Sequence, residues 1–381
     1  MKILFSKIAP SLPLLATMVF QITLVSKFGL SAQLDTYFIF SGFNAFFLAI
    51  LGALTIYWAF PNVTQNGNRR YFDAVFTLAI IINIIALIVG VAIYYHTGNS
   101  LPIVLALLIT PSIIISISMY SHYSDGDYIT GSILNTLPSL FAFLVIIYFD
   151  EISLLKIVWT LVLATFMAVF FSITSKLPKF SLYSLGLLNS SESKNLFRSS
   201  IVSKSMSPID RTILSYGPEG YVTLFALFER IIMVGVTLSV KYHEVILLSS
   251  NIKSKKIIAR FFPILVLLIC CYYLAYNLFY EYFLTSAFYP ESLKSVETFF
   301  IFLVLFGPIY VCLLWLNSLV VAELYKKNEH KYIFLINLFM QLIGLLLKFL
   351  IIIFASFTLL PLAMALVSAV NLLLFYKRLK A

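Results

Sequence analysis

Long apolar runs separated by short polar segments make up most of the chain. Twelve of these runs approach the ~20 residues that an α-helix needs to cross the hydrocarbon core of a bilayer. They lie at approximately 8–25, 37–60, 74–95, 101–120, 131–149, 154–174, 199–216, 219–240, 261–280, 297–321, 332–354 and 357–376. The pattern therefore predicts an all-α polytopic membrane protein with about twelve transmembrane helices.

Composition supports the same class of protein. Hydrophobic residues make up 61% of the 381 positions and charged residues only 11%, against about one quarter in soluble domains. The formal charge of +10 does not form a nucleic-acid patch, because the basic residues fall between the apolar runs. A lipid bilayer is the expected partner, and nucleic acid is not.

The positions of the basic residues predict which way the helices cross the membrane. With the N-terminus in the cytoplasm, nineteen basic residues fall on the inside and three on the outside. Inside loops of membrane proteins are enriched in Lys and Arg, so both termini are predicted to be cytoplasmic. The loop at 121–130 is the exception, because it is predicted to lie inside and has no basic residue. The first run follows Lys2 and Lys7 as in a signal peptide, but a retained helix is the better interpretation.

The chain also contains a weak internal repeat. VSKFGLSAQLDTYFIF at 25–40 aligns with ILSYGPEGYVTLFALF at 213–228, and each copy is a span, a short outer turn with glycine and a second span. Six spans in each half predict two lobes related by a pseudo-two-fold axis along the membrane normal, with the substrate site expected between them. The predicted boundaries are an N-terminal lobe at 1–175, a cytoplasmic linker at 176–198 and a C-terminal lobe at 199–381.

Ionisable side chains inside the apolar runs are the strongest functional signal. In the seventh run, polar residues recur at helical spacing and predict one polar stripe: Ser200, Lys204, Ser207, Arg211 and Ser215. Pro208 lies in the same segment and removes one backbone hydrogen bond, which is expected to kink the helix or to free a carbonyl. A charge at the centre of a bilayer costs ~2.5–3.5 kcal/mol on insertion scales, so the stripe should face other helices or water.

Two segments of the repeat resemble a known superfamily. FGLSAQLDTYFIF and SPIDRTILSYGPEGYVTLFALFERI are similar to the starts of the two halves in the multidrug/oligosaccharidyl-lipid/polysaccharide exporter superfamily. Within it the chain most resembles the bacterial polysaccharide (O-antigen) flippases, which are related to the lipid II flippases. The resemblance implies a V of two lobes, a cavity lined mainly by spans 1, 2, 7 and 8, and a location in the bacterial cytoplasmic (inner) membrane.

The resemblance also implies the substrate and the partners. The expected substrate is an oligosaccharide linked through pyrophosphate to a polyprenol, which the protein would move to the outer leaflet. Other polysaccharide-assembly membrane proteins are candidate partners. No cofactor or metal is predicted, and a coupling ion, sodium or a proton, remains an open question at this point. The protein is predicted not to be an enzyme.

Nine residues are candidates for the cavity. Arg can bind a pyrophosphate bidentately and Lys supplies a point charge, which favours a polyanion in a site lined by both. The candidates are Gln21, Tyr37, Asn44, Lys204, Asp210, Arg211, Glu229, Arg230 and Lys348. Unlike the lipid II relatives, spans 1 and 2 here contain no Arg or Lys, so the positive charge comes mostly from the second half.

Each candidate also has a structural interpretation. Glu229 and Arg230 are candidates for a pair that holds one lobe together, and Lys348 for a side chain that extends to the interface. Polar residues such as Asn44 often join neighbouring helices.

Other functions remain as alternatives. A multidrug antiporter of the same superfamily would use acidic residues, here Asp35, Asp210 and Glu229. A membrane polymerase or glycosyltransferase is disfavoured because the outer loops are short. His122, Asp125 and Asp127 resemble a metal or glycosyl-transfer site, but their spacing fits no standard calcium loop, and a polar turn is the better interpretation.

Overall fold

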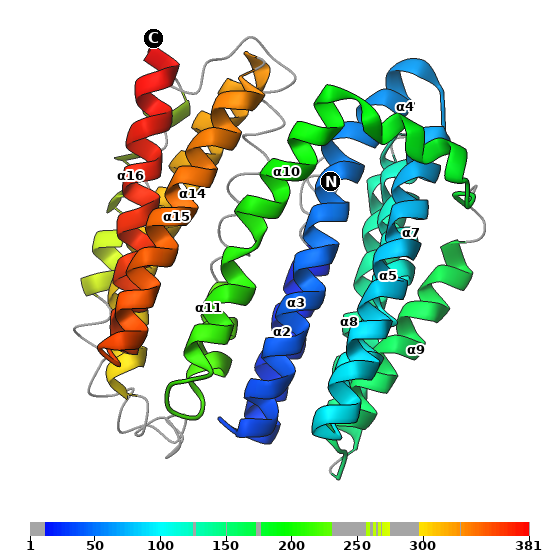
Figure 1. Ribbon diagram of the computed structural model, residues 1–381. Helices are drawn as coiled ribbons and strands as arrows, with labels where there is room; N and C mark the ends of the chain where they lie inside the picture. The colour runs from blue at the N-terminus through cyan, green and yellow to red at the C-terminus, as the bar shows by residue number, and fades with distance from the viewer. Residues whose placement is uncertain are drawn as a thin grey trace. The chain divides into compact units, whose positions relative to one another are not determined.

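The computed structural model describes residues 12–124, 127–149, 151–172, 177–230, 257–259, 262–263, 266–267, 269–274, 297–327 and 329–380. Within these ranges every regular element is a helix (Figure 1). Eight helices in them are long and apolar enough to cross a membrane, and α2 (Leu12–Phe28) is a shorter apolar helix. The chain is therefore a multi-pass membrane protein by length and composition of its helices.

Residue packing divides the chain into two compact units, Met1–Arg211 and Thr212–Ala381. The first unit contains α2, α3 (Ala32–Leu54), a π-helical turn (Thr55–Ala59), α4 (Phe60–Asn66), α5 (Arg70–Thr97), α6 (Leu101–Ala106), α7 (Ile109–Ser124), α8 (Tyr128–Tyr148), α9 (Leu154–Ser172), a 3-10 helix η3 (Leu182–Asn189) and α10 (Ser191–Lys204). The helix α11 (Met206–Leu214) crosses from the first unit to the second. The predicted lobe boundaries remain predictions.

The six predicted spans of the first half each coincide with observed helices. The first is α2, the second continues through the π turn as Ala32–Thr64, and α6 and α7 together form the fourth at Leu101–Tyr123. In the second unit, α14 (Glu297–Lys326), α15 (His330–Ile353), η5 (Phe357–Leu359) and α16 (Leu360–Lys380) correspond to the last three spans. Half of the ninth span and the second half of the eighth lie outside the described residues.

Three helix irregularities occur about one turn before a proline. A proline ring clashes with the carbonyl four residues earlier and removes one backbone hydrogen bond. Accordingly, α6 ends before Leu107, four residues ahead of Pro111, and α10 ends at Lys204, four residues ahead of Pro208. Ahead of Pro61 the helix widens into the π turn, where the amide of Phe60 donates to the carbonyl of Thr55. The predicted kink at Pro208 is confirmed as an interruption at Ser205.

The first unit has an apolar core between α3, α5 and α7. Its fully buried members include Leu51 and Trp58 from the second span, Val75 from α5 and Ile113 from α7. Elsewhere in the unit α2 packs on α8, where the hydroxyls of Thr17 and Ser139 lie 3.1 Å apart. Apolar packing therefore accounts for most of this bundle, and polar side chains join helices at individual points.

One lysine that the sequence predicts to lie outside has a structural role in this unit. The ammonium of Lys27, in the last turn of α2, donates to the carbonyls of Ile146 (2.9 Å) and Phe149 at the end of α8. The last carbonyls of a helix lack intrahelical partners and carry partial negative charge, so a cation stabilises them. Lys27 is thus explained by helix capping and does not conflict with the excess of basic residues predicted inside.

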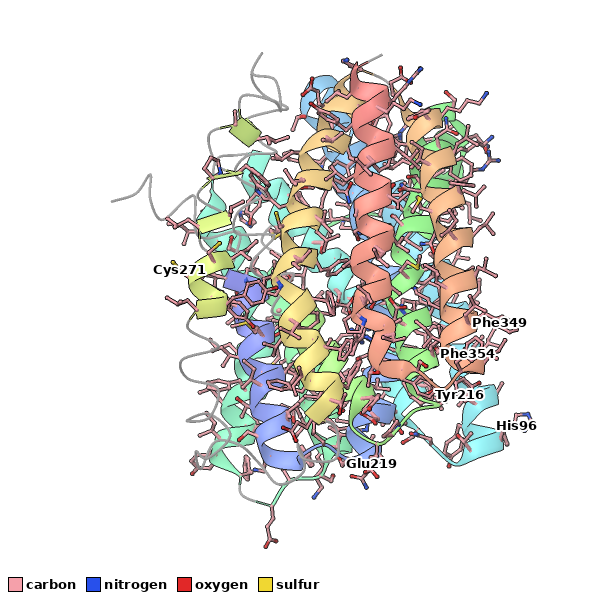
Figure 2. All side chains as sticks on the ribbon, turned by 90° about the vertical axis from the view of Figure 1, so that its left-hand side faces the viewer. His96, Tyr216, Glu219, Cys271, Phe349 and Phe354 are labelled. Carbon is pink, nitrogen blue, oxygen red and sulfur yellow. The ribbon has the colours of Figure 1, made fainter. Side chains whose placement is uncertain are left out.

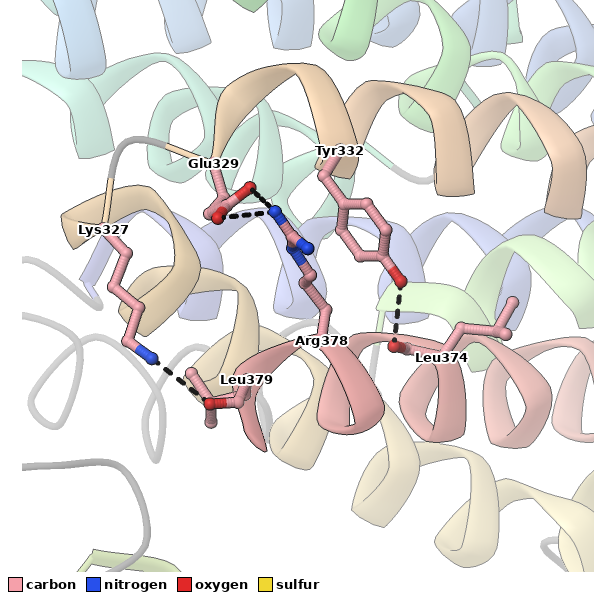
Figure 3. Close-up of polar contacts among 6 residues, drawn as sticks. All are labelled: Lys327, Glu329, Tyr332, Leu374, Arg378 and Leu379. Atoms are coloured by element: carbon pink, nitrogen blue, oxygen red, sulfur yellow. Dashed lines mark hydrogen bonds and ion pairs between the residues drawn. The ribbon is translucent and has the colours of Figure 1, made fainter. Parts of the chain in front are cut away.

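The second unit contains a polar cluster that joins the end of α16 to the start of α15 (Figure 3). One guanidinium nitrogen of Arg378 lies 2.9 and 3.0 Å from the two carboxylate oxygens of Glu329, and the Arg378 guanidinium also lies over the ring of Tyr332 at 4.9 Å. The Lys327 ammonium donates to the Leu379 carbonyl at 3.2 Å. These contacts use basic residues of predicted inside segments to close the end of the unit.

Many of the exposed side chains are apolar, as expected for a surface that faces lipid. On α15 a stripe of exposed apolar residues recurs every three or four positions: Leu335, Leu338, Phe339, Leu342, Leu345, Leu346, Phe349 and Ile353. Phe349 and Phe354, labelled in Figure 2, are 59% and 71% exposed. In water such a patch would be unusual, whereas in a bilayer it contacts lipid chains.

The segment predicted as a polar linker is largely ordered helix. Residues 182–189 form the 3-10 helix η3, which packs against α5, and α10 begins at Ser191. The seventh span was predicted to begin at residue 199, so its helix starts eight residues earlier than expected. The cause is a start signal that the hydropathy pattern does not register: the Ser190 hydroxyl caps α10 by accepting from the amide of Ser193.

The topology can be tested with single cysteines in a background lacking Cys270, Cys271 and Cys312. If the N-terminus is cytoplasmic, Asn68→Cys should resist a membrane-impermeant thiol reagent in intact cells, because the reagent reaches only the outer face. His96→Cys and Glu219→Cys, at exposed positions labelled in Figure 2, should react. Labelling of Asn68→Cys together with protection of His96→Cys would reverse the orientation.

Candidate functional site

The predicted polar stripe is divided between two helices. Its first two members belong to α10 and its third and fourth to α11, with the interruption at Ser205 between them. Ser200 is 5% exposed and Arg211 is 7% exposed, whereas Lys204 and Ser215 are exposed. The stripe is therefore not one face of a continuous helix, and its members lie in different environments.

Arg211 contacts the backbone of α3. Its Nη1 atom donates to the carbonyl oxygen of Phe38 at 2.7 Å, within the first unit. This carbonyl lies in the interior of α3, at a residue that is itself fully buried. A hydrogen bond from a charged donor is short and strong in a low-dielectric environment, so it offsets part of the cost of burying the guanidinium.

Gly42 leaves the space that the guanidinium occupies. A Cβ atom at position 42 would lie 2.9 Å from both Cδ and Nη1 of Arg211. Gly42 is one helical turn beyond Phe38, so the carbonyl and the space lie on the same face of α3. Together they form a notch, defined here as the Phe38 carbonyl and Gly42, that holds Arg211.

Lys204 and Asp210 both precede Arg211 in sequence but differ in burial. Asp210 is 2% exposed and precedes Arg211 directly. Lys204 is exposed in the last turn of α10, where a cation interacts favourably with the helix dipole. Arg211 is thus a buried cation with a defined partner, and Lys204 is the accessible one.

Two of the three candidates on α2 and α3 are close to fully buried. Gln21 is 6% exposed and Tyr37 is 3% exposed, with the Tyr37 ring packed edge-on against Phe38 at 5.1 Å. Asn44 is half-buried, and within the described structure its Oδ1 atom has no hydrogen-bond partner. Leaving a buried acceptor unsatisfied costs about 1–3 kcal/mol, so Asn44 stands out among them.

The second unit holds the remaining candidates. Glu229 and Arg230 are half-buried at the end of the described helix 221–230. Lys348 on α15 is 4% exposed and Gln341, two turns earlier, is 8% exposed. Lys348 therefore does not extend to the interface in this structure, and it lies away from the exposed apolar stripe of its helix.

Sequence reasoning missed both parts of the notch. A backbone carbonyl has no sequence signature, so Phe38 could not have been selected. Gly42, by contrast, interrupts an apolar helix in the run FIFSGFNAF, and an isolated glycine there is a recognised sign of close approach. That signal was present and would have identified the helix face that receives Arg211.

The polar turn after α7 has a structural role. Asp127 is the N-cap of α8, where its Oδ1 accepts from the amide of Thr130 at 3.1 Å, and its Oδ2 lies 3.6 Å from Nδ1 of His122. The hydrogen bond to the Thr130 side chain is the main cause that lowers the pKa of Asp127 below its ordinary value. The Asp127 cap therefore stabilises α8 fully at pH values above the ordinary pKa of an aspartate. This stabilisation is lost as the pH falls through the lowered pKa of Asp127. Asp125 lies outside the described residues.

Comparisons with known proteins identify the fold of the chain. No family model matches the chain, and no curated protein matches it in sequence. Solved structures match over almost its whole length, and they are transporters of the superfamily that the sequence resembles. The chain has the fold of that superfamily, as the resemblance predicted.

Three of the matching structures illustrate the range of that fold. One is the lipid II flippase MurJ in an inward closed conformation, with a TM-score of 0.71, 17% identity, and coverage of 100% of this chain and 88% of that one. A second is an outward-facing multidrug resistance MATE family transporter, with a TM-score of 0.68, 12% identity, and coverage of 98% and 95%. A third is a transporter from Pyrococcus furiosus described as having a binding pocket of reverse polarity, with a TM-score of 0.54, 12% identity, and coverage of 99% and 96%.

The notch can be tested with two glycines of the same helix. Gly42→Ala should displace Arg211 from the Phe38 carbonyl and lower the free energy of unfolding by about 1.5–3 kcal/mol, the value of a hydrogen bond to a charged group. Gly52→Ala is the matched control, because a Cβ there meets no atom within 4 Å and alanine favours the helix. Thermal unfolding of the purified variants measures the difference.

A double-mutant cycle separates the notch from general crowding on α3. In an Arg211→Met background the cost of Gly42→Ala should fall, because no guanidinium remains to be displaced. If Gly42→Ala costs the same in both backgrounds, Gly42 does not act through Arg211.

Proposed function

We propose that this protein is a membrane transporter that moves a polyprenyl-pyrophosphate-linked oligosaccharide, such as an O-antigen or capsule repeat unit, from the cytoplasmic to the outer leaflet. The observation that carries the proposal is the charge inside the spans. Spans 7, 8 and 11 contain four basic residues, Lys204, Arg211, Arg230 and Lys348, and three acidic ones, Asp210, Glu229 and Glu219, which is the first residue of span 8. A cavity with that excess attracts polyanions and repels cations, because low-dielectric walls screen charge weakly.

Each basic candidate has a distinct part in the proposal. Lys204 is exposed at the C-terminal end of α10 and would offer a point charge to a phosphate. Arg211 donates to the Phe38 carbonyl of its notch through Nη1, and a guanidinium carries five N–H donors in a planar fork. We propose that the substrate pyrophosphate engages this fork during transport.

The rest of the candidate set would contact other parts of the substrate. Asn44 presents a buried acceptor that suits a hydroxyl donor of a sugar, and Tyr37 presents an aromatic ring to the same region of α3. Alternating exposure of the site to the two membrane faces would follow from rocking of the two halves of the fold. A coupling ion, sodium or a proton, and a location in the bacterial inner membrane are part of this proposal.

A multidrug antiporter is the second candidate function, because the MATE transporter structures share the fold to a similar degree. In that case Asp35, Asp210 and Glu229 would bind a cationic drug or its coupling ion. Of these, Asp210 is nearly fully buried, Glu229 is half-buried and Asp35 lies in the first turn of α3. The excess of basic residues favours the flippase over this alternative.

The cationic site is tested by substitution at its accessible member. Lys204→Gln removes the charge at an exposed position and should reduce transport about tenfold or more without unfolding the protein, because a charge-assisted contact contributes roughly 1.5–3 kcal/mol. Lys331→Gln, which removes an exposed lysine at the start of α15, should leave transport unchanged. Equal transport by the two variants would remove Lys204 from the site.

A deletion strain distinguishes the two functions. Loss of a flippase should strand the lipid-linked precursor on the cytoplasmic leaflet and lower surface polysaccharide, while accumulation of a cationic dye changes little. Loss of an antiporter should leave surface polysaccharide intact and raise dye accumulation. Normal surface glycan combined with raised dye accumulation would make the flippase proposal wrong.

A further inference from the structure

Residues 177–190, called here the docked linker, lie alongside the start of α5. The Thr77 hydroxyl accepts from the amide of Ser181 at 3.0 Å, and Oδ1 of Asp73 accepts from the amide of Lys179 at 2.7 Å. The 3-10 helix η3 within this segment packs against the same part of α5. The docked linker is therefore a fixed part of the first unit.

The depth of this contact places the docked linker beside the membrane surface. Asp73 and Thr77 lie three and seven residues beyond Arg70, the first residue of a span, which corresponds to about 5–10 Å along the helix. Irregular backbone at that level needs internal hydrogen-bond partners, because lipid offers none. Side chains of α5 supply them for Lys179 and Ser181, and the Ser181 hydroxyl accepts from the amide of Ser184.

The two sides of the docked linker are both largely apolar. Ser184 is buried, and Leu187 and Leu188 pack on the apolar core of the first unit. The opposite side is exposed: Leu177 is 39%, Phe180 is 55%, Leu182 is 64% and Tyr183 is 83% accessible. Large apolar and aromatic side chains at an interfacial depth are the kind that insert between lipid headgroups.

Basic residues surround this exposed side. The guanidinium of Arg70 lies 5.9 Å from the centre of the Tyr183 ring, and Lys179 is exposed within the segment itself. Lys194 and Arg198, one turn apart on the adjoining helix α10, are also exposed. These positive charges are attracted to a layer of anionic headgroups. Their attraction to a zwitterionic layer is much weaker.

We propose that the docked linker is an interfacial anchor that binds anionic phospholipid headgroups of the cytoplasmic leaflet. Phe180, Leu182 and Tyr183 insert at the boundary of headgroups and acyl chains, while Arg70 and Lys179 pair with phosphate groups. Anionic lipid then stabilises the packing of this segment on Asp73 and Thr77. The inference is independent of the transported substrate, so it stands whether the protein is a flippase or an antiporter.

Lipid contact is tested with a fluorophore on Tyr183→Cys, in a background lacking Cys270, Cys271 and Cys312 and reconstituted in nanodiscs. A nitroxide placed shallowly on the acyl chain should quench the fluorophore strongly, and aqueous iodide should quench it little. Tyr183 is 83% exposed, so the label does not disturb the core. Quenching by iodide alone would show a water-facing segment, and protection from both quenchers would show a covering protein or second copy. Each of those results overturns the anchor.

Headgroup selectivity is tested by comparing nitroxide-labelled phosphatidylglycerol with nitroxide-labelled phosphatidylcholine at the same fluorophore. The anionic lipid should be preferred, and Lys179→Gln should lower that preference about fivefold, the contribution of one basic residue near a membrane surface. Lys156→Gln removes an exposed lysine from the opposite end of the same unit and should leave the preference unchanged. Equal quenching by both lipids in the unmodified protein would overturn the role of the basic residues.

Discussion

A positive charge placed in an apolar environment must be satisfied locally, and this constraint organises the segment around Arg211. The guanidinium donates to a backbone carbonyl of α3 in a space that exists only because residue 42 is glycine. The first unit ends at this residue, so the contact holds the last part of the unit, α10 and the start of α11, to α3. Substrate binding would then compete with, or add to, an interaction that already stabilises the fold.

The same requirement appears wherever the backbone departs from a regular helix. The end of α8 is satisfied by Lys27, the start of α8 by Asp127, and the docked linker by Asp73 and Thr77. Polar side chains in this chain are few, and many of those described serve backbone groups that lipid cannot satisfy. A polar residue in a span is therefore first a candidate for such a role, and its use in transport needs separate evidence.

Much of the fold could be predicted from hydropathy alone. The first six spans coincide with described helices, because a run of about twenty apolar residues can satisfy its backbone hydrogen bonds in a bilayer by forming an α-helix. The start of α10 was placed eight residues too late, because a serine cap among polar residues has no hydropathy signal. The prediction for Pro208 was confirmed, since its steric clash with Lys204 depends only on covalent geometry.

The candidate site was less accessible to prediction. Spacing placed Lys204 and Arg211 on one stripe, but the interruption between them separates an exposed lysine from a buried arginine. Tertiary contacts decide which of these side chains is buried. The partner of Arg211 is a backbone carbonyl oxygen, which every residue possesses, so the sequence does not indicate it. Lys348 shows the same limit, because its position near the end of a span suited an extended side chain, whereas the structure buries it.

Equilibrium binding to the purified protein tests the central claim, that the cations of this fold hold a lipid-linked pyrophosphate. A polyprenyl pyrophosphate should bind at least about tenfold more tightly than the matching polyprenyl alcohol, because charge-assisted pairing is lost with the pyrophosphate. The preference should shrink in Arg211→Lys, which retains the charge without the planar fork. Equal affinity for the two lipids, together with saturable binding of a cationic dye, would contradict the account.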